Sequence, residues 1–292
     1  MPQLFIYPVK SLQPVQLDAV ELTDSGLRFD RSFALIYTPE GSADGSPPLA
    51  RHLTIKKTFS LALFQPHIDE TWTRLTVNHV GTDPPSSITV PLTPSPLDAL
   101  DAKTFQLSIF GTTAIGIDMG EGAATFFTEH LGSGVRLVFI GGSGRREIPG
   151  SRFARDWLDA ESLGLEEEFR LQRVKFADAA PLLITSTASE REARGRLRED
   201  DRDEDIILRF RPNVHIDVKD VLPPYDEDNW HTLSIRRASS SDCQVTVNCV
   251  YQCVRCLSIN ADLSTGGMVN RDRQLYGLLA RDRRINEAFP RR

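Results

Sequence analysis

The chain begins with a series of short apolar segments separated by glycine or proline, and this pattern restricts its fold more than any other feature. The segments are rich in Val, Ile, Leu, Phe and Thr, and they cover residues 3–9, 15–22, 32–38, 61–65, 74–80 and 87–91. Short β-branched and aromatic runs with frequent turns are typical of closely spaced strands in a sandwich or barrel. We therefore expect the first part of the chain to form β-sheet.

Strands and helices alternate in the rest of the chain. Strand-like segments recur at 105–117, 135–140, 206–218, 230–236 and 243–250. Between the first two of these, apolar side chains recur at helical spacing over residues 121–131 and predict a short amphipathic helix. Residues 190–205 are almost all charged with both signs mixed, which is typical of the solvated face of a helix. The order of elements predicts a mainly β fold with flanking helices (α+β) in two lobes.

The charge balance excludes several classes of partner. The net charge is -6, whereas nucleic-acid and anionic-membrane binders need a basic face, so we expect no nucleic acid as a stable partner. No stretch reaches the roughly 18 apolar residues that span a bilayer, so we expect no membrane anchor. The first residues show no basic leader and no cleavage site, which indicates a cytoplasmic protein, with mitochondrial association not excluded.

Two motifs in the first lobe suit an anion. Lys10 and Ser11 follow the first predicted strand, where a point charge beside a hydroxyl donor could bind phosphate. Asp30 and Arg31 lie between apolar strand residues, and they could form a structural ion pair. Alternatively, Arg31 could add donors to the same anion site. Surface Lys-Ser pairs are common, so Lys10 and Ser11 could equally be ordinary surface residues. The residues alone do not decide between these alternatives for either motif.

Two further motifs lie in the second lobe. Thr185 and Ser186 begin a hydroxyl-rich run that first suggests helix capping, and the exposed amides at such a helix start would also favour an anion. Pro212 should keep Arg211 extended, so that Arg211 and Asn213 flank a rigid kink and present planar donors and an amide. An edge strand with exposed arginines is the alternative for this second motif.

All four cysteines fall within one short segment: Cys243, Cys249, Cys253 and Cys256. This clustering argues against a secreted disulfide framework, which would join distant segments. The thiols could form a structural zinc site, a redox pair, or a single thiolate ligand to a soft transition metal with Arg255 beside it. The spacing alone does not choose among these.

Six short motifs occur here in one order, and together they resemble those of a known family. They are Tyr-Pro-Val-Lys-Ser at 7–11, Gly-Leu-x-x-Asp-Arg at 26–31, Pro-Leu-Leu-Ile-Thr-Ser at 181–186, Phe-Arg-Pro-Asn at 210–213, Tyr-Asp-Glu-Asp-Asn-Trp at 225–230 and Cys-Val-Arg-Cys at 253–256. The chain resembles the MOSC proteins with an N-terminal β-barrel domain, the group of the mitochondrial amidoxime-reducing component and its bacterial relatives. The resemblance runs from residue 4 to about 267.

The resemblance implies a fold, a cofactor and a site. It implies an N-terminal MOSC-associated β-barrel domain over 1–140 and a MOSC-type β-barrel over 141–292. It also implies the molybdenum cofactor (Mo-molybdopterin), with Cys256 as the metal ligand and catalytic residue. The residues implied to bind the cofactor are Lys10, Ser11, Arg31, Thr185, Ser186, Arg211, Asn213 and Arg255. Converging positive side chains would let an acidic protein hold an anionic cofactor.

The same resemblance implies a molybdenum-dependent oxidoreductase that reduces N-hydroxylated small molecules. Electrons would come from a separate partner, cytochrome b5 with its reductase or a flavin reductase. One alternative is a non-catalytic cofactor or sulfur-carrier module, similar to the C-terminal domain of molybdenum cofactor sulfurase, although the pyridoxal-phosphate domain of the complete sulfurase is not found here. Another alternative is an inactive relative, because the family's glycine-rich closing segment is expected beyond the point where this chain stops, at Arg292.

Overall fold

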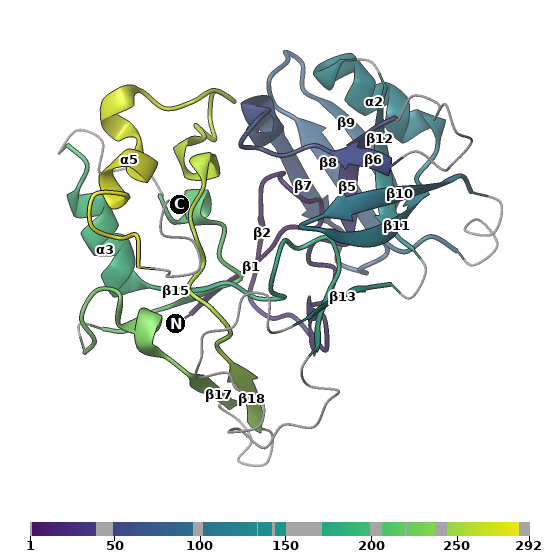
Figure 1. Cartoon of the computed structure of the whole chain (residues 1–292). Helices are drawn as coiled ribbons and strands as arrows, with labels where there is room; N and C mark the ends of the chain where they lie inside the picture. Colours follow the sequence, from purple (N-terminus) through teal and green to yellow (C-terminus); the bar gives the residue numbers. More distant parts are fainter. Residues whose placement is uncertain are drawn as a thin grey trace.

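A closed barrel of five strands forms the centre of the N-terminal half (Figure 1). Its strands are β5 (Phe33–Tyr37), β6 (Leu49–His52), β10 (Thr104–Ile109), β11 (Thr112–Asp118) and β12 (Val135–Ile140). They follow the order β10-β11-β12-β5-β6, and parallel pairing of β6 with β10 closes the ring. Closure leaves these strands without a free edge, so the barrel is a stable wall for neighbouring loops.

A three-stranded antiparallel sheet and one helix complete the N-terminal half. The strands are β7 (Phe64–Ile68), β8 (Arg74–His79) and β9 (Ser86–Pro91). Buried and exposed residues alternate along β7, as expected when one face of a sheet meets the core. Helix α2 (Glu121–Leu131) packs on this sheet and puts Phe126 and Phe127 against Phe64.

A four-stranded sheet joins the start of the chain to the C-terminal half. Its strands are β1 (Gln3–Ile6), β2 (Val15–Leu17), β15 (Ile184–Ser186) and β16 (Val214–Ile216), in the order β15-β16-β1-β2. Leu4 pairs with Val214, so β1 crosses from one lobe into the sheet of the other. In Figure 1, β1, β2 and β15 lie between the two lobes. The loops at the ends of these strands are therefore brought to one place.

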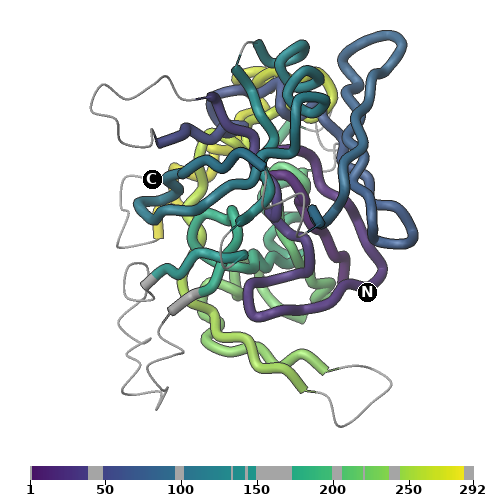
Figure 2. Tube along the Cα trace, turned by 90° about the vertical axis from the view of Figure 1, so that its right-hand side faces the viewer, coloured from purple at the N-terminus to yellow at the C-terminus, as the bar shows by residue number. Residues whose placement is uncertain are grey.

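The remaining strands form two-stranded pairs, and the remaining helices are short. The pairs are β3 (Leu22–Thr23) with β4 (Gly26–Leu27), β13 (Arg146–Pro149) with β14 (Leu171–Val174), and β17 (Thr232–Arg236) with β18 (Gln244–Asn248). The helices are α3 (Thr187–Gly195), α4 (Ile207–Phe210) and α5 (Leu275–Leu279). The 3-10 turns are η1 (Phe59–Leu63), η6 (Asp226–Asn229), η7 (Leu257–Asn260) and η8 (Arg271–Arg273). Figure 2 shows the β17–β18 hairpin extending from the body of the protein.

The predicted mainly β fold with flanking helices is confirmed, and α2 occupies the predicted helix at 121–131. The strand predicted at 61–65 is wrong in its first part, where η1 precedes β7. The Leu61 amide donates to the Thr58 carbonyl at 3.2 Å, a local turn bond in place of the pairing with a neighbouring strand that a β-strand makes. The strand predicted at 206–218 is also wrong in part, because α4 occupies 207–210 before β16 begins.

The computed structural model describes residues 2–38, 49–95, 102–132, 134–141, 144–149, 171–198, 206–219, 221–236 and 244–285. Several predicted features lie outside these ranges: Cys243, part of the charged run at 199–205, and the expected truncation beyond residue 285. Within the described ranges, no helix combines the length and apolar character that crossing a membrane would require.

Candidate functional site

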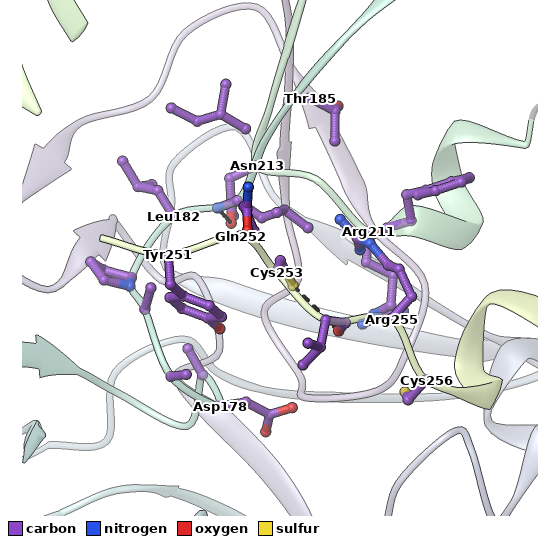
Figure 3. A pocket seen from close by; sticks show the side chains of 18 of the residues that line it. Asp178, Leu182, Thr185, Arg211, Asn213, Tyr251, Gln252, Cys253, Arg255 and Cys256 are labelled. Carbon is purple, nitrogen blue, oxygen red and sulfur yellow. Dashed lines mark hydrogen bonds between the residues drawn. The ribbon is translucent and has the colours of Figure 1, made fainter. Parts of the chain in front are cut away.

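One large cavity of about 1420 Å³ collects most of the residues that the sequence singled out. Its walls come from the segment between β1 and β2, from β6, from the segment before β15, from the turn between α4 and β16, and from the loop after β18. The residues of the predicted site that line it are Lys10, Ser11, Arg31, Thr185, Arg211, Asn213, Arg255 and Cys256. Figure 3 shows part of this wall, with Arg211, Arg255 and Cys256 on one side of the view.

Cys256 is exposed to the cavity from the loop that precedes η7. Its Sγ lies 3.0 Å from the Ser258 hydroxyl. Cys249 and Cys253 are only partly exposed, and burial raises the pKa of the Cys249 thiol. Within the described ranges, no three His, Cys, Asp or Glu side chains form a group that could hold a metal ion, and Cys243 lies outside those ranges. The accessible thiol in this loop is therefore Cys256.

Two guanidinium groups pack on one buried aromatic ring. Tyr7 is fully buried, and the guanidinium carbons of Arg31 and Arg211 lie 4.3 Å and 4.2 Å from its ring centroid. Burial raises the pKa of Tyr7 to about 12, against the effect of both arginines, so the phenol stays neutral. Burial lowers the pKa of Arg211 to about 10, which still leaves it charged near neutral pH. Cation–π contact thus fixes two positive charges in the cavity wall.

The backbone at Arg211 differs from the expectation for a residue before proline. Arg211 has φ 60° and ψ 46°, in the left-handed region, and ends α4 instead of extending the chain. Its carbonyl accepts a hydrogen bond of 3.4 Å from Arg31, and its side chain stacks on Tyr7. We attribute the left-handed conformation to these tertiary contacts, which override the local preference imposed by Pro212.

The ion pair predicted for Arg31 is present, while its part in an anion site stays a prediction. Its guanidinium pairs with Asp30 at 2.6 Å, so the structural ion pair is present, and Arg31 also lines the cavity. Asn213 accepts a second hydrogen bond from Arg31 at 3.0 Å. Asn213 is itself buried, receives the Leu183 amide at 3.1 Å and donates to Phe5 at 3.2 Å. Asn213 therefore links three segments of the wall as well as facing the cavity.

Lys10 has a partner that the sequence did not indicate. Its amino group donates to the Phe176 carbonyl at 2.9 Å and forms an ion pair with Asp178. Burial lowers the pKa of Lys10, while Asp178 opposes that shift. The Asp178 side chain is 53% exposed because it faces the cavity, and although burial acts to raise its pKa, Lys10 holds it below its usual value. In the sequence, the feature that could have pointed to Asp178 is its position as a single carboxylate just before the motif at 181–186.

The two residues of the hydroxyl motif, Thr185 and Ser186, have different roles. Ser186 caps α3, where its side chain accepts a hydrogen bond from the Ser189 amide at 3.2 Å, so the predicted capping is confirmed. Ser186 is buried and does not line the cavity. Thr185 does line it, and its hydroxyl lies 2.9 Å from Nδ1 of His215.

Ser11 and Arg255, the remaining residues of the predicted set, also contact neighbouring residues of the cavity wall. Ser11 has φ 74° and donates to the Leu53 carbonyl at 3.5 Å. Arg255 donates to the Phe210 carbonyl at 3.0 Å and lies over the Phe210 ring, 5.2 Å from its centroid. The guanidinium groups of Arg31, Arg211 and Arg255, together with the accessible thiol of Cys256, suit an anionic ligand that also offers a soft metal centre.

Comparison with known proteins gives two family matches. Residues 1–134 match the family model described as MOSC N-terminal beta barrel domain, and residues 171–287 match the MOSC domain. Molybdenum cofactor sulfurase of Danio rerio is 28% identical over 274 residues, which cover 91% of this chain and 28% of that protein. Mitochondrial amidoxime-reducing component 1 of Mus musculus is 28% identical over 270 residues, covering 90% of this chain and 66% of that protein.

The chain therefore spans less than two thirds of the length of either curated relative. Among solved structures, the solution structure of a protein from Bordetella bronchiseptica aligns over 43% of this chain and 90% of its own, with 15% identity and a TM-score of 0.28. A similarity at that level supports no argument about this chain.

Proposed function

The chain belongs to the MOSC proteins with an N-terminal β-barrel domain, and on that basis we propose that it is a molybdenum-cofactor-dependent oxidoreductase. The proposed reaction is reduction of N-hydroxylated small molecules, in which an N–O bond breaks and two electrons and two protons yield the amine or amidine and water. The similarity to an amidoxime-reducing component over 90% of the chain supports this reaction.

The single observation that carries the proposal is the accessible Cys256 thiol in a cavity that Arg31, Arg211 and Arg255, each stacked on an aromatic ring, also line. Cys256 would ligate the metal, since a thiolate is a favoured ligand of soft transition metals. Arg31, Arg211 and Arg255 would bind the anionic part of the cofactor. When bound, the cofactor supplies a metal centre that exchanges two electrons.

The remaining lining residues would orient the cofactor and substrate. Thr185 and Ser11 offer hydroxyls, while Asn213 fixes the segments that carry Arg31 and Arg211. Ser186 would act indirectly, by capping the helix that follows Thr185. Lys10 holds a proton against Asp178 at the cavity wall, so an anion that approaches Lys10 must compete with that carboxylate.

Electrons would come from a separate protein, a cytochrome b5 with its reductase or a flavin reductase, and we propose a cytoplasmic location. A second candidate is a cofactor or sulfur-carrier module without turnover. The similarity to molybdenum cofactor sulfurase favours this second candidate. The match covers 91% of this chain but only 28% of that larger protein, so this chain would correspond to one module of it.

The decisive experiment is metal analysis together with benzamidoxime reduction, using protein produced in a host that makes the cofactor. We expect about one molybdenum per chain and reductase activity for the wild type, with both lost in Cys256→Ala. Cys253→Ala is the matched control, and it should keep its molybdenum. Molybdenum without turnover, with a chemical reductant as well, would favour the module, and zinc in place of molybdenum would contradict both candidates.

A further inference from the structure

Three basic side chains at the cavity wall are exposed and uncompensated: Arg51, Lys56 and Lys57, which we call the basic rim. No ion pair or hydrogen bond links any of these side chains to another residue of the described ranges. The whole chain has a net charge of -6. A concentration of unpaired positive charge at one cavity therefore contrasts with the rest of the protein.

The fold holds the basic rim in place. Leu53 and Ile55 are buried in the main core, so the intervening chain is anchored at alternate positions. The Leu53 amide donates to the Leu35 carbonyl at 2.8 Å, and the Lys57 amide donates to the Thr54 carbonyl at 2.9 Å. The rim thus belongs to the end of β6 and an ordered turn. Its charges are presented from a rigid wall, which reduces the entropy lost on binding.

Three carboxylates of the cavity have basic partners. Asp178 pairs with Lys10, Asp24 with Arg145, and Glu190 with Arg194. These carboxylates are therefore poorly placed to neutralise the basic rim. Within the part of the chain that the structure describes, no carboxylate pairs with the rim, so an anionic ligand that reaches it would meet a positive potential.

The basic rim adjoins the proposed cofactor residues without overlapping them. His52 lines the cavity beside the rim, and its pKa is lowered to about 4 by burial first and then by Lys10, with a smaller effect from Lys56. His52 therefore lies within electrostatic reach of both Lys10 and the rim. The cavity volume of about 1420 Å³ also exceeds the roughly 300–1,000 Å³ of ordinary ligand pockets. A cavity of this volume offers more room than one ordinary ligand fills.

We propose that the basic rim binds the carboxylate or phosphate group of an anionic N-hydroxylated substrate. This inference rests on the proposed function, because it assigns the substrate class of that same site. Arg51, Lys56 and Lys57 would attract the anionic end, while the N–O group lies toward Cys256. Exposed charges at the edge of a site act mainly on recognition and capture, so the rim selects the substrate rather than performing the reaction.

The test compares two substrates of similar shape, benzamidoxime and 4-carboxybenzamidoxime. Their affinities for the cofactor-loaded protein are measured by calorimetry without a reductant, so that no turnover is needed. The wild type should bind the carboxylate compound more tightly, and Lys56→Gln/Lys57→Gln should weaken that binding about 3- to 10-fold. Affinity for neutral benzamidoxime should not change. Raising the salt concentration should reduce the wild-type preference.

Arg74→Gln is the matched control, since Arg74 is exposed on β8 and does not line the cavity. It should leave both affinities unchanged. Equal affinity of the wild type for the two compounds would overturn the proposal, as would an equal loss for both compounds in the rim variant. Loss of molybdenum from the rim variant would also overturn it, by assigning the rim to the cofactor. If neither compound is reduced when a reductant is added, the proposed function fails, while the binding data still decide the preference.

Discussion

Arg209 offers the most direct test of how the fold supports the loop that carries Cys256. The side chain is 1% exposed, and its Nε donates to the Ile259 carbonyl at 2.7 Å. A second donor reaches the Arg273 carbonyl at 3.0 Å. Ile259 belongs to η7, which begins directly after Cys256, so one guanidinium ties α4 to the ligand loop. We therefore choose Arg209→Met, which keeps much of the apolar chain and removes the donors.

The magnitude follows from these two contacts. Hydrogen bonds from a charged donor contribute about 1.5–3 kcal/mol each, and their loss leaves two carbonyls without this donor. We expect the free energy of unfolding to fall by about 3–5 kcal/mol, a large part of the roughly 5–15 kcal/mol typical of a folded protein.

Urea unfolding measures this change, followed by both tryptophan fluorescence and circular dichroism so that two-state behaviour is checked. Arg74→Met is the control, because an exposed arginine should change stability by less than about 0.5 kcal/mol. A loss below about 1 kcal/mol for Arg209→Met would refute the reasoning. In that case, the hydrogen bonds to η7 would contribute little, and the position of the ligand loop would have another cause.

Three other predictions concern the site and its walls. Tyr7→Leu should lower stability by about 2–4 kcal/mol and reduce bound molybdenum, since it removes the ring under Arg31 and Arg211. Tyr7→Phe should preserve both, because the buried hydroxyl has no hydrogen-bond partner among the residues that the structure describes. Gly26→Ala should destabilise more than Gly120→Ala in thermal unfolding: both have positive φ, but only at Gly26 would the added carbon lie 2.6 Å from the Pro181 carbonyl. For His52, the folded pKa of about 4 lies below the ordinary 6.5, so the unfolded state alone gains a proton as pH falls between these values. The free energy of unfolding should then fall by up to about 1.4 kcal/mol per pH unit, and an unchanged slope in His52→Gln would contradict this origin.

Local patterns in the sequence predicted much of the fold. The helix at 121–131 follows from apolar spacing, and the cap at Ser186 follows from its hydroxyl run, because both depend on residues a few positions apart. The same local rules failed where η1 occupies the first part of a predicted strand, and where Arg211, which stacks on Tyr7, is left-handed. The proposed division near residue 140 stays a prediction, and the pairing of β1 with β16 crosses it.

The sequence by itself determined the mainly β class and the residue types available for an anion and a soft metal. Only the tertiary structure decided which of these groups are neutralised. Lys10 is matched by Asp178, which lies 168 residues away, whereas Lys56 has no partner among the described residues. Both are lysines a few residues past the end of a strand, and their neighbours along the chain do not show which of them meets a carboxylate. Charge pairing depends on distances in space, and long-range strand pairing sets those distances.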